Sequence, residues 1–134
     1  MKLELDHVAV AVHSIKPALK IYRDGLGGEY LMGSEVDDTW RWLQLRFPGG
    51  GKIELLEPLG AESPIAKFLE RHPDGGIHHV CYEVDDILAA RDRLTASGAR
   101  VLGDGTPKMG AHDKPVLFLH PKDFCGTLVE LEQA

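Results

Sequence analysis

The pattern of apolar and polar residues divides the chain into two similar series of strands and helices. Alternating apolar positions predict a strand over 3–12, and helical spacing predicts a helix that is capped by Ser14 and ends at the glycines of 25–28. Further alternation predicts three strands, with a glycine-rich turn between the second and third and a short amphipathic helix after them. These strands cover 29–36, 40–47 and 52–58, and the short helix covers 63–70.

The same order of elements then begins again. A strand is predicted over 77–84, and a helix capped by Asp85 or Asp86 runs to Ser97. Three more strands follow, over 100–102, 116–120 and 127–131. The sequence therefore predicts an α+β protein of two tandem βαβββ modules, about 1–60 and about 75–134. A short helical linker joins them into a single domain over 1–134.

The two modules align residue by residue at their first and last strands. The segment DHVAVAV lies over HHVCYEV, and IEL lies over VEL, so that His7 corresponds to His79 and Glu54 to Glu130. The two His-to-Glu separations are 47 and 51 residues, a difference that loop lengths explain. Each module thus supplies one histidine and one glutamate at equivalent positions.

The adjacent histidines of the segment GGIHHVCYEV point to opposite faces of their strand. The alignment assigns His79 to the face that His7 occupies, and it leaves His78 on the other face as a packing or hydrogen-bonding residue. Gly75 and Gly76 are expected to form the hinge at which the second module begins.

Two imidazoles and two carboxylates form a ligand set that suits a divalent Mn, Fe, Co, Ni or Zn ion. A six-coordinate ion would keep two positions for substrate or water, as catalytic sites do. The simpler alternative is that both glutamates face water on half-exposed strands. Four matched positions in a duplicated unit favour the metal site.

Composition narrows the class of protein. The chain has 134 residues, of which 43% are hydrophobic and 27% charged, and its net charge is −6. This acidic balance argues against nucleic acid or an anionic membrane as partner. Two cysteines without a zinc-finger spacing, and no signal-peptide or transmembrane pattern, predict a cytoplasmic protein, or one of the mitochondrial matrix if a transit peptide has been removed.

The chain resembles the vicinal oxygen chelate superfamily, and within it the methylmalonyl-CoA epimerases. The resemblance rests on six segments in the same order over nearly the whole chain: DHVAVAV, KIELLEPLG, SPIAKFL, GGIHHVCYEVDDI, GAHDKPVLFLHPKD and GTLVELE. It implies a glyoxalase-like fold, in which a curved mixed sheet surrounds a metal-binding cleft. It also implies epimerisation of (2R)- and (2S)-methylmalonyl-CoA through a metal-stabilised enolate, and a homodimer.

The resemblance also implies the roles of single residues. The metal ligands are His7, Glu54, His79 and Glu130, with one Co, Mn, Ni or Zn ion per site, and Glu130 is the first candidate for the catalytic acid–base group. The acyl-CoA thioester would contact Lys122, His112 and Gly110.

The second acid–base group stays open. Some relatives place a glutamate on the strand before Glu54, but here that strand reads TWRWLQLRF and has no carboxylate. Glu54, a metal-bound hydroxide and a loop residue remain as alternatives.

Other functions are also open. A glyoxalase I-type lactoylglutathione lyase would use a similar ligand set. A 2-His-1-carboxylate dioxygenase is disfavoured by the fourth ligand. A metal-free ligand-binding module of the same superfamily needs no ligand set, and a folded dimer without a metal is the simplest alternative.

Overall fold

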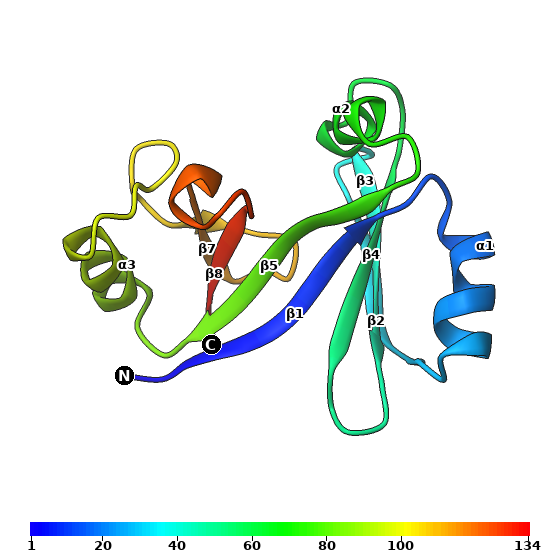
Figure 1. Cartoon of the computed structure of the whole chain (residues 1–134), viewed down its shortest axis with the longest axis horizontal. Coiled ribbons are helices and arrows are strands. Elements are labelled where there is room, and N and C mark those ends of the chain that lie inside the picture. The colour runs from blue at the N-terminus through cyan, green and yellow to red at the C-terminus, as the bar shows by residue number, and fades with distance from the viewer. The chain divides into compact units, whose positions relative to one another are not determined.

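The computed structural model describes residues 1–134, which divide into two compact units (Figure 1). The N-terminal unit is His7–His78, and the C-terminal unit is Met1–Asp6 together with His79–Ala134. Strands β1 (Leu3–Ala11) and β5 (Gly76–Val84) each contribute residues to both units. No helix has the length and apolar character needed to cross a membrane. The prediction of a single domain stays a prediction.

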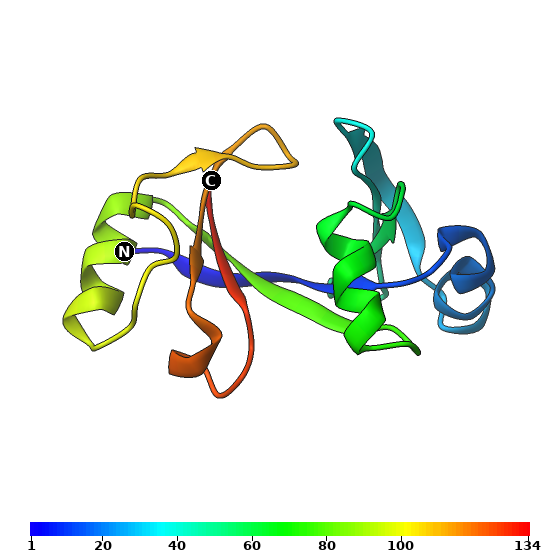
Figure 2. The same cartoon turned by 90° about the horizontal axis from the view of Figure 1, so that it is seen from above.

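The N-terminal unit is a mixed sheet with helices on two sides (Figures 1 and 2). Its strands are ordered β2-β3-β4-β1, with β1 parallel to β4 and the other neighbours antiparallel. The helices α1 and α2 both contact β4. The elements besides β1 are α1 (Ile15–Leu19), the π-helix η1 (Lys20–Gly25), β2 (Glu29–Val36), β3 (Trp40–Arg46), β4 (Lys52–Pro58) and α2 (Pro64–Arg71).

The predicted first helix is confirmed in place, but its cap differs from the prediction. Ser14 occupies the N-cap position and makes no side-chain hydrogen bond there. Instead the backbone N–H of Ile15 donates to Glu57 Oε1 at 2.7 Å, so a carboxylate from β4 satisfies the exposed end of the helix. At α2 the N-cap is Ser63, whose hydroxyl accepts from the N–H of Ile65 at 3.2 Å.

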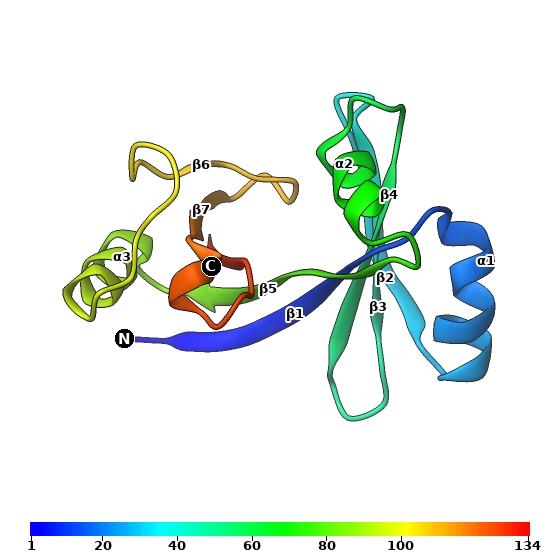
Figure 3. The same ribbon diagram turned by 45° about the horizontal axis from the view of Figure 1, so that its top comes forward.

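The C-terminal unit repeats this arrangement (Figure 3). Its strands are ordered β5-β8-β7-β6, with β5 parallel to β8 and the remaining pairs antiparallel. Asp86 is the N-cap of α3, since its carboxylate accepts from the N–H of Ala89 at 3.0 Å. The elements besides β5 are α3 (Ile87–Ala96), β6 (Lys108–Met109), β7 (Pro115–Leu119), the 3₁₀ helix η2 (Pro121–Asp123) and β8 (Val129–Gln133).

The predicted strand over 100–102 is wrong. That segment forms only a single bridge, between Val101 and Leu119, and the edge strand of the unit is β6. Gly103 and Gly105 have φ values of 73° and 80°, so the backbone turns away between the two segments. A strand of two residues is too short to give an alternating pattern in the sequence.

The pairing register confirms the internal repeat. In the N-terminal unit Ala9 lies opposite Glu54, and in the C-terminal unit Cys81 lies opposite Glu130. Ala9 is two residues after His7, and Cys81 is two residues after His79. The predicted α+β fold with two βαβββ modules and a mixed sheet is therefore confirmed.

Gly75 explains why the second module begins with glycine. Its φ is +80°, and a Cβ at this position would lie 2.6 Å from the backbone oxygen of Ala11. Only glycine allows this close approach of the backbone to β1.

Candidate metal centre and active site

The N-terminal unit holds a buried histidine–glutamate pair. His7 on β1 and Glu54 on β4 are both buried, and His7 Nε2 lies 3.4 Å from Glu54 Oε2. A buried carboxylate is costly unless a partner compensates its charge. The apolar neighbours of Glu54 belong to the pattern of a buried strand, so the glutamate is part of a built site and does not face water as the simpler alternative required.

Gln44 completes this pair and was missed in the sequence. It lies on β3 directly opposite Glu54 and is fully buried. Its Nε2 donates to Glu54 Oε1 at 3.2 Å and lies 3.4 Å from His7 Nδ1. The signal for it was an uncharged polar residue at a position where β3 otherwise alternates toward the core. Gln44 therefore holds the carboxylate and the imidazole in place.

The C-terminal unit holds the equivalent pair. His79 Nε2 lies 3.3 Å from Glu130 Oε1, and both residues are buried. Phe118 on β7 lies opposite Glu130, in the position that Gln44 has in the other module. Its ring meets the His79 imidazole edge to face, with centroids 5.9 Å apart. The two pairs thus share one geometry and differ in their support, which is polar in one unit and aromatic in the other.

His78 makes the packing contact that was predicted for it. Its ring and the Phe68 ring of α2 meet edge to face, with centroids 5.1 Å apart, within the N-terminal unit. The predicted packing role of His78 is confirmed, whereas the role of its neighbour His79 as a metal ligand stays a prediction.

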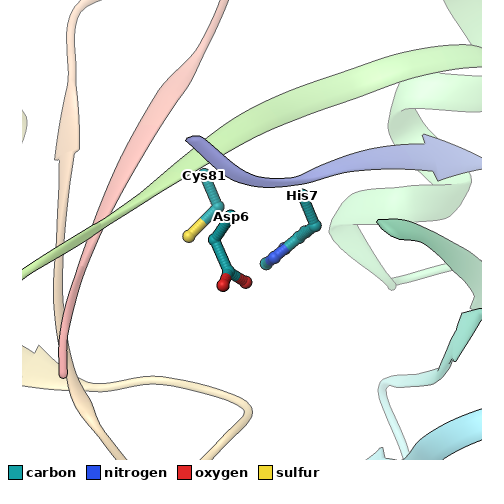
Figure 4. A group of neighbouring side chains, drawn as sticks. All are labelled: Asp6, His7 and Cys81. Carbon is teal, nitrogen blue, oxygen red and sulfur yellow. The ribbon is translucent and has the colours of Figure 1, made fainter. Parts of the chain in front are cut away.

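A buried thiol lies beside Glu130. The ligand atoms of Cys81, Glu130 and Glu132 are all within 4.8 Å of one another. Figure 4 shows Cys81 with Asp6 and its chain neighbour His7, and the Asp6 carboxylate is within 4.8 Å of the Cys81 sulfur. Burial, and then the charges of Glu130 and Glu132, raise the pKa of the Cys81 thiol well above its usual range. Cys81 is therefore a neutral thiol at physiological pH.

Glu132 was also missed in the sequence analysis. It is buried on β8, and its Oε2 accepts from His112 Nδ1 at 2.8 Å. His112 was predicted to bind substrate, and the structure places its side chain, which is 8% exposed, against this carboxylate. The sequence signal was the spacing Glu130-x-Glu132, because residues two apart on a strand share a face.

The other predicted substrate-binding residues are Gly110 and Lys122. Gly110 begins the turn that holds His112: its N–H donates to the Lys114 carbonyl at 2.9 Å, and its carbonyl accepts from the N–H of Asp113 at 3.1 Å. A Cβ on Gly110 would lie 2.7 Å from Val116 Cγ1. Lys122 is exposed on η2. Contact of these residues with substrate stays a prediction.

The donor spacing of each pair fits a divalent metal ion. Two donors that each lie about 2.1 Å from one tetrahedral or octahedral ion are roughly 3.0–3.4 Å apart. The two nitrogen-to-oxygen distances, 3.4 Å and 3.3 Å, fall at the upper end of this range. Neutral imidazole nitrogens with carboxylate oxygens suit Mn, Co, Ni and Zn. Both pairs therefore have the chemistry and the spacing of ligands to such an ion.

Known proteins share this fold and sequence. The family profile described as "Glyoxalase/Bleomycin resistance protein/Dioxygenase superfamily" matches residues 6–118. The chain is 60% identical over 131 residues to the ethylmalonyl-CoA/methylmalonyl-CoA epimerase of Cereibacter sphaeroides, with 96% of each chain covered.

Two solved structures extend the likeness. The methylmalonyl-CoA epimerase of Mycobacterium tuberculosis is 36% identical with a TM-score of 0.86, covering 97% of this chain and 87% of that one. A methylmalonyl-CoA epimerase in complex with methylmalonyl-CoA and NH4+ is 29% identical with a TM-score of 0.86, covering 100% of this chain and 96% of that one. The chain belongs to the glyoxalase/bleomycin resistance protein/dioxygenase superfamily and, within it, to the methylmalonyl-CoA epimerase family.

Proposed function

We propose that the protein is an enzyme that interconverts (2R)- and (2S)-methylmalonyl-CoA with the help of a divalent metal ion. The observation that carries the proposal is the duplicated histidine–glutamate pair, in the same register of both modules, in a chain 60% identical to an epimerase of this class. Removal of the proton next to a thioester is slow because negative charge develops on the thioester oxygen. A site that places positive charge there lowers this barrier by several kcal/mol.

The proposed ligands are His7, Glu54, His79 and Glu130. The proposal assigns all four to one ion, because the two modules carry matched histidine and glutamate positions. When bound, this ion, proposed as Co, Mn, Ni or Zn, would supply positive charge next to the thioester oxygen of the substrate.

The residues of the chain have distinct roles in this proposal. Glu130 takes the C2 proton on one face of the substrate, and Gln44 keeps the Glu54 carboxylate oriented through its hydrogen bond. Lys122, whose side chain is exposed, binds an anionic group of the acyl-CoA thioester. His112 and the turn that begins at Gly110 lie beside β8 and contact the acyl part.

Proton exchange tests this function directly. The purified protein, stripped of metal and reloaded with Co, Mn, Ni or Zn, is expected to exchange the C2 proton of methylmalonyl-CoA in D2O and to convert one epimer into the other. Absence of exchange together with turnover of a glutathione hemithioacetal would replace the proposal by the lyase. Absence of both, with no bound ion, would favour the metal-free binding module.

The ratio of metal to protein separates two arrangements of the ligands. One ion per chain, abolished by substitution of either histidine, agrees with a shared ion. Two ions per chain would mean that each pair binds its own, and the shared centre would be wrong.

A cytoplasmic homodimer is part of the proposal. Tyr30 on β2 and Met109 on β6 are more than half exposed, on the outer strands of their units. When a second copy of the chain packs against such an outer strand, apolar surface is removed from water. Light scattering on a sizing column is expected to give twice the mass of one chain.

A further inference from the structure

The glutamates of the two ligand pairs are held by donors on different strands. In the N-terminal unit Glu54 on β4 lies opposite Ala9 on β1 and Gln44 on β3. Side chains that lie directly opposite one another extend to the same face of a sheet and can interact. Ala9 has no polar side-chain atom, so the donor of these two neighbours is Gln44, whose Nε2 donates to Glu54 Oε1 at 3.2 Å. Glu54 is thus held from the third strand of its module.

The C-terminal unit has the opposite arrangement around Glu130. This residue of β8 lies opposite Cys81 on β5 and Phe118 on β7. Phe118 has no hydrogen-bond donor in its side chain, whereas the Cys81 thiol has an S–H group. A side-chain hydrogen bond joins Cys81 to Glu130, and the sulfur lies within 4.8 Å of a Glu130 carboxylate oxygen. The donor has therefore moved from the third strand of the module to the first.

We propose that Cys81 is the positioning residue of Glu130, in the role that Gln44 has for Glu54. This inference rests on the proposed function, in which Glu130 is a metal ligand and an acid–base group. An ionised carboxylate can only accept a hydrogen bond, so the thiol donates its S–H to Glu130. Partners of this kind orient a ligating carboxylate and are needed for full metal affinity.

Two further carboxylates lie near the Cys81 thiol. Glu132 and Asp6 each have an oxygen within 4.8 Å of the sulfur, and Figure 4 shows the Asp6 carboxylate beside it. Their charges act on Cys81, but the hydrogen bond is with Glu130. Glu132 accepts from His112 Nδ1 at 2.8 Å and so has a donor from another element. The thiol is therefore assigned to Glu130.

Burial makes the thiol important to the carboxylate. Cys81 is fully buried and Glu130 is 8% exposed, so water has little access to replace a lost donor. Loss of a partner to a metal ligand typically weakens metal binding about 10–100-fold. A thiol is a weak donor, so the lower end of this range, about 10-fold, is expected.

Two substitutions at Cys81 test the role. Cys81→Ala removes the donor and introduces the residue that β1 has at the equivalent position, Ala9. Isothermal titration of the metal-free protein with Co²⁺ should then show about 10-fold weaker binding. Cys81→Ser keeps a donor on a side chain of similar size, so its Co²⁺ affinity should be close to that of the wild type.

Urea unfolding of the metal-free variants separates positioning from packing. Serine places a more polar group than alanine at a fully buried position, so Cys81→Ser should be no more stable than Cys81→Ala. If Cys81 only packed, Co²⁺ affinity would follow stability and serine would bind the ion no better than alanine. Wild-type affinity in Cys81→Ala, or an equal loss of affinity in both variants, would overturn the inference.

The absorption spectrum of the Co²⁺-loaded protein distinguishes a positioning residue from a ligand. A thiol that binds a metal ion loses its proton, and the resulting thiolate gives a sulfur-to-cobalt charge-transfer band. The wild type and Cys81→Ser should have the same spectrum without this band. A band that is lost in Cys81→Ser would make Cys81 a ligand and overturn the inference. The control is Cys125→Ser, an exposed cysteine, which should leave both the affinity and the spectrum unchanged.

The metal titrations do not depend on the substrate, so the inference and the proposed function can fail separately. A wild-type protein that binds Co²⁺ but does not exchange the C2 proton of methylmalonyl-CoA would refute the epimerase function, while the two Cys81 variants still decide the role of the thiol. A wild-type protein that exchanges this proton, with Co²⁺ affinity unaffected in Cys81→Ala, would refute the positioning role alone.

Discussion

The substitution Gln44→Leu is expected to weaken metal binding while it leaves the free energy of unfolding of the metal-free protein nearly unchanged. The substitution removes the hydrogen bond from Gln44 Nε2 to Glu54 Oε1, which is 3.2 Å long and buried. Hydrogen bonds to charged groups contribute about 1.5–3 kcal/mol. However, Gln44 Oε1 is buried without a hydrogen-bond partner, and such an atom costs about 1–3 kcal/mol. The two effects offset each other, so the free energy of unfolding of the metal-free protein should change little.

Metal affinity should respond differently. Without its hydrogen-bond donor, the Glu54 carboxylate is no longer oriented, and loss of such a partner typically weakens binding about 10–100-fold, equivalent to roughly 1.4–2.7 kcal/mol. Isothermal titration of the metal-free protein with Co²⁺ measures this affinity, and urea unfolding measures the stability.

Leu45→Ala is the matched control for this experiment. Leu45 is the next residue on β3, faces the apolar core with Ile15 and Leu55, and is almost fully buried. Its truncation should cost about 2–5 kcal/mol of unfolding free energy and leave the affinity of the folded protein unchanged. If Gln44→Leu binds Co²⁺ as the wild type does, Gln44 does not position a metal ligand.

Three further predictions concern the rest of the molecule. Gly75→Ala should lower the unfolding free energy by about 1–3 kcal/mol, because the added Cβ meets a β1 backbone oxygen at positive φ; an unchanged melting temperature would refute this. A thiol reagent should label the exposed Cys125 alone in the native protein and Cys81 as well in guanidinium, since Cys81 is buried; two fast thiols in the native state would contradict the fold. Arg100 holds the pKa of the Asp123 carboxyl below its usual value of 3.8 by hydrogen bonding, so the bridge stabilises the protein above that pH and is lost as pH falls through the lower folded-state pKa. Asp123→Asn should therefore lower the melting temperature at pH 7, and its difference from the wild type should narrow below pH 3.8; a constant difference would refute the assignment.

The sequence by itself determined the features that repeat or depend on local patterns. Alternation and helical spacing predicted nearly every element, and the duplication predicted that each module supplies one histidine, His7 or His79, and one glutamate, Glu54 or Glu130. In both modules the glutamate lies opposite the residue two positions after the histidine, because the two modules share one strand register. The strand over 100–102 was predicted wrongly, because glycine turns and a two-residue strand leave no periodic signal.

Only the tertiary structure decided which other polar residues join the pairs. Gln44 reaches His7 across 37 residues of chain, and His112 reaches Glu132 across 20. Neither contact leaves a periodic trace in the sequence, because each depends on which strands become neighbours and on how one loop closes. The physical reason is that a buried carboxylate needs a donor, and the fold alone determines which side chain is near enough to supply it.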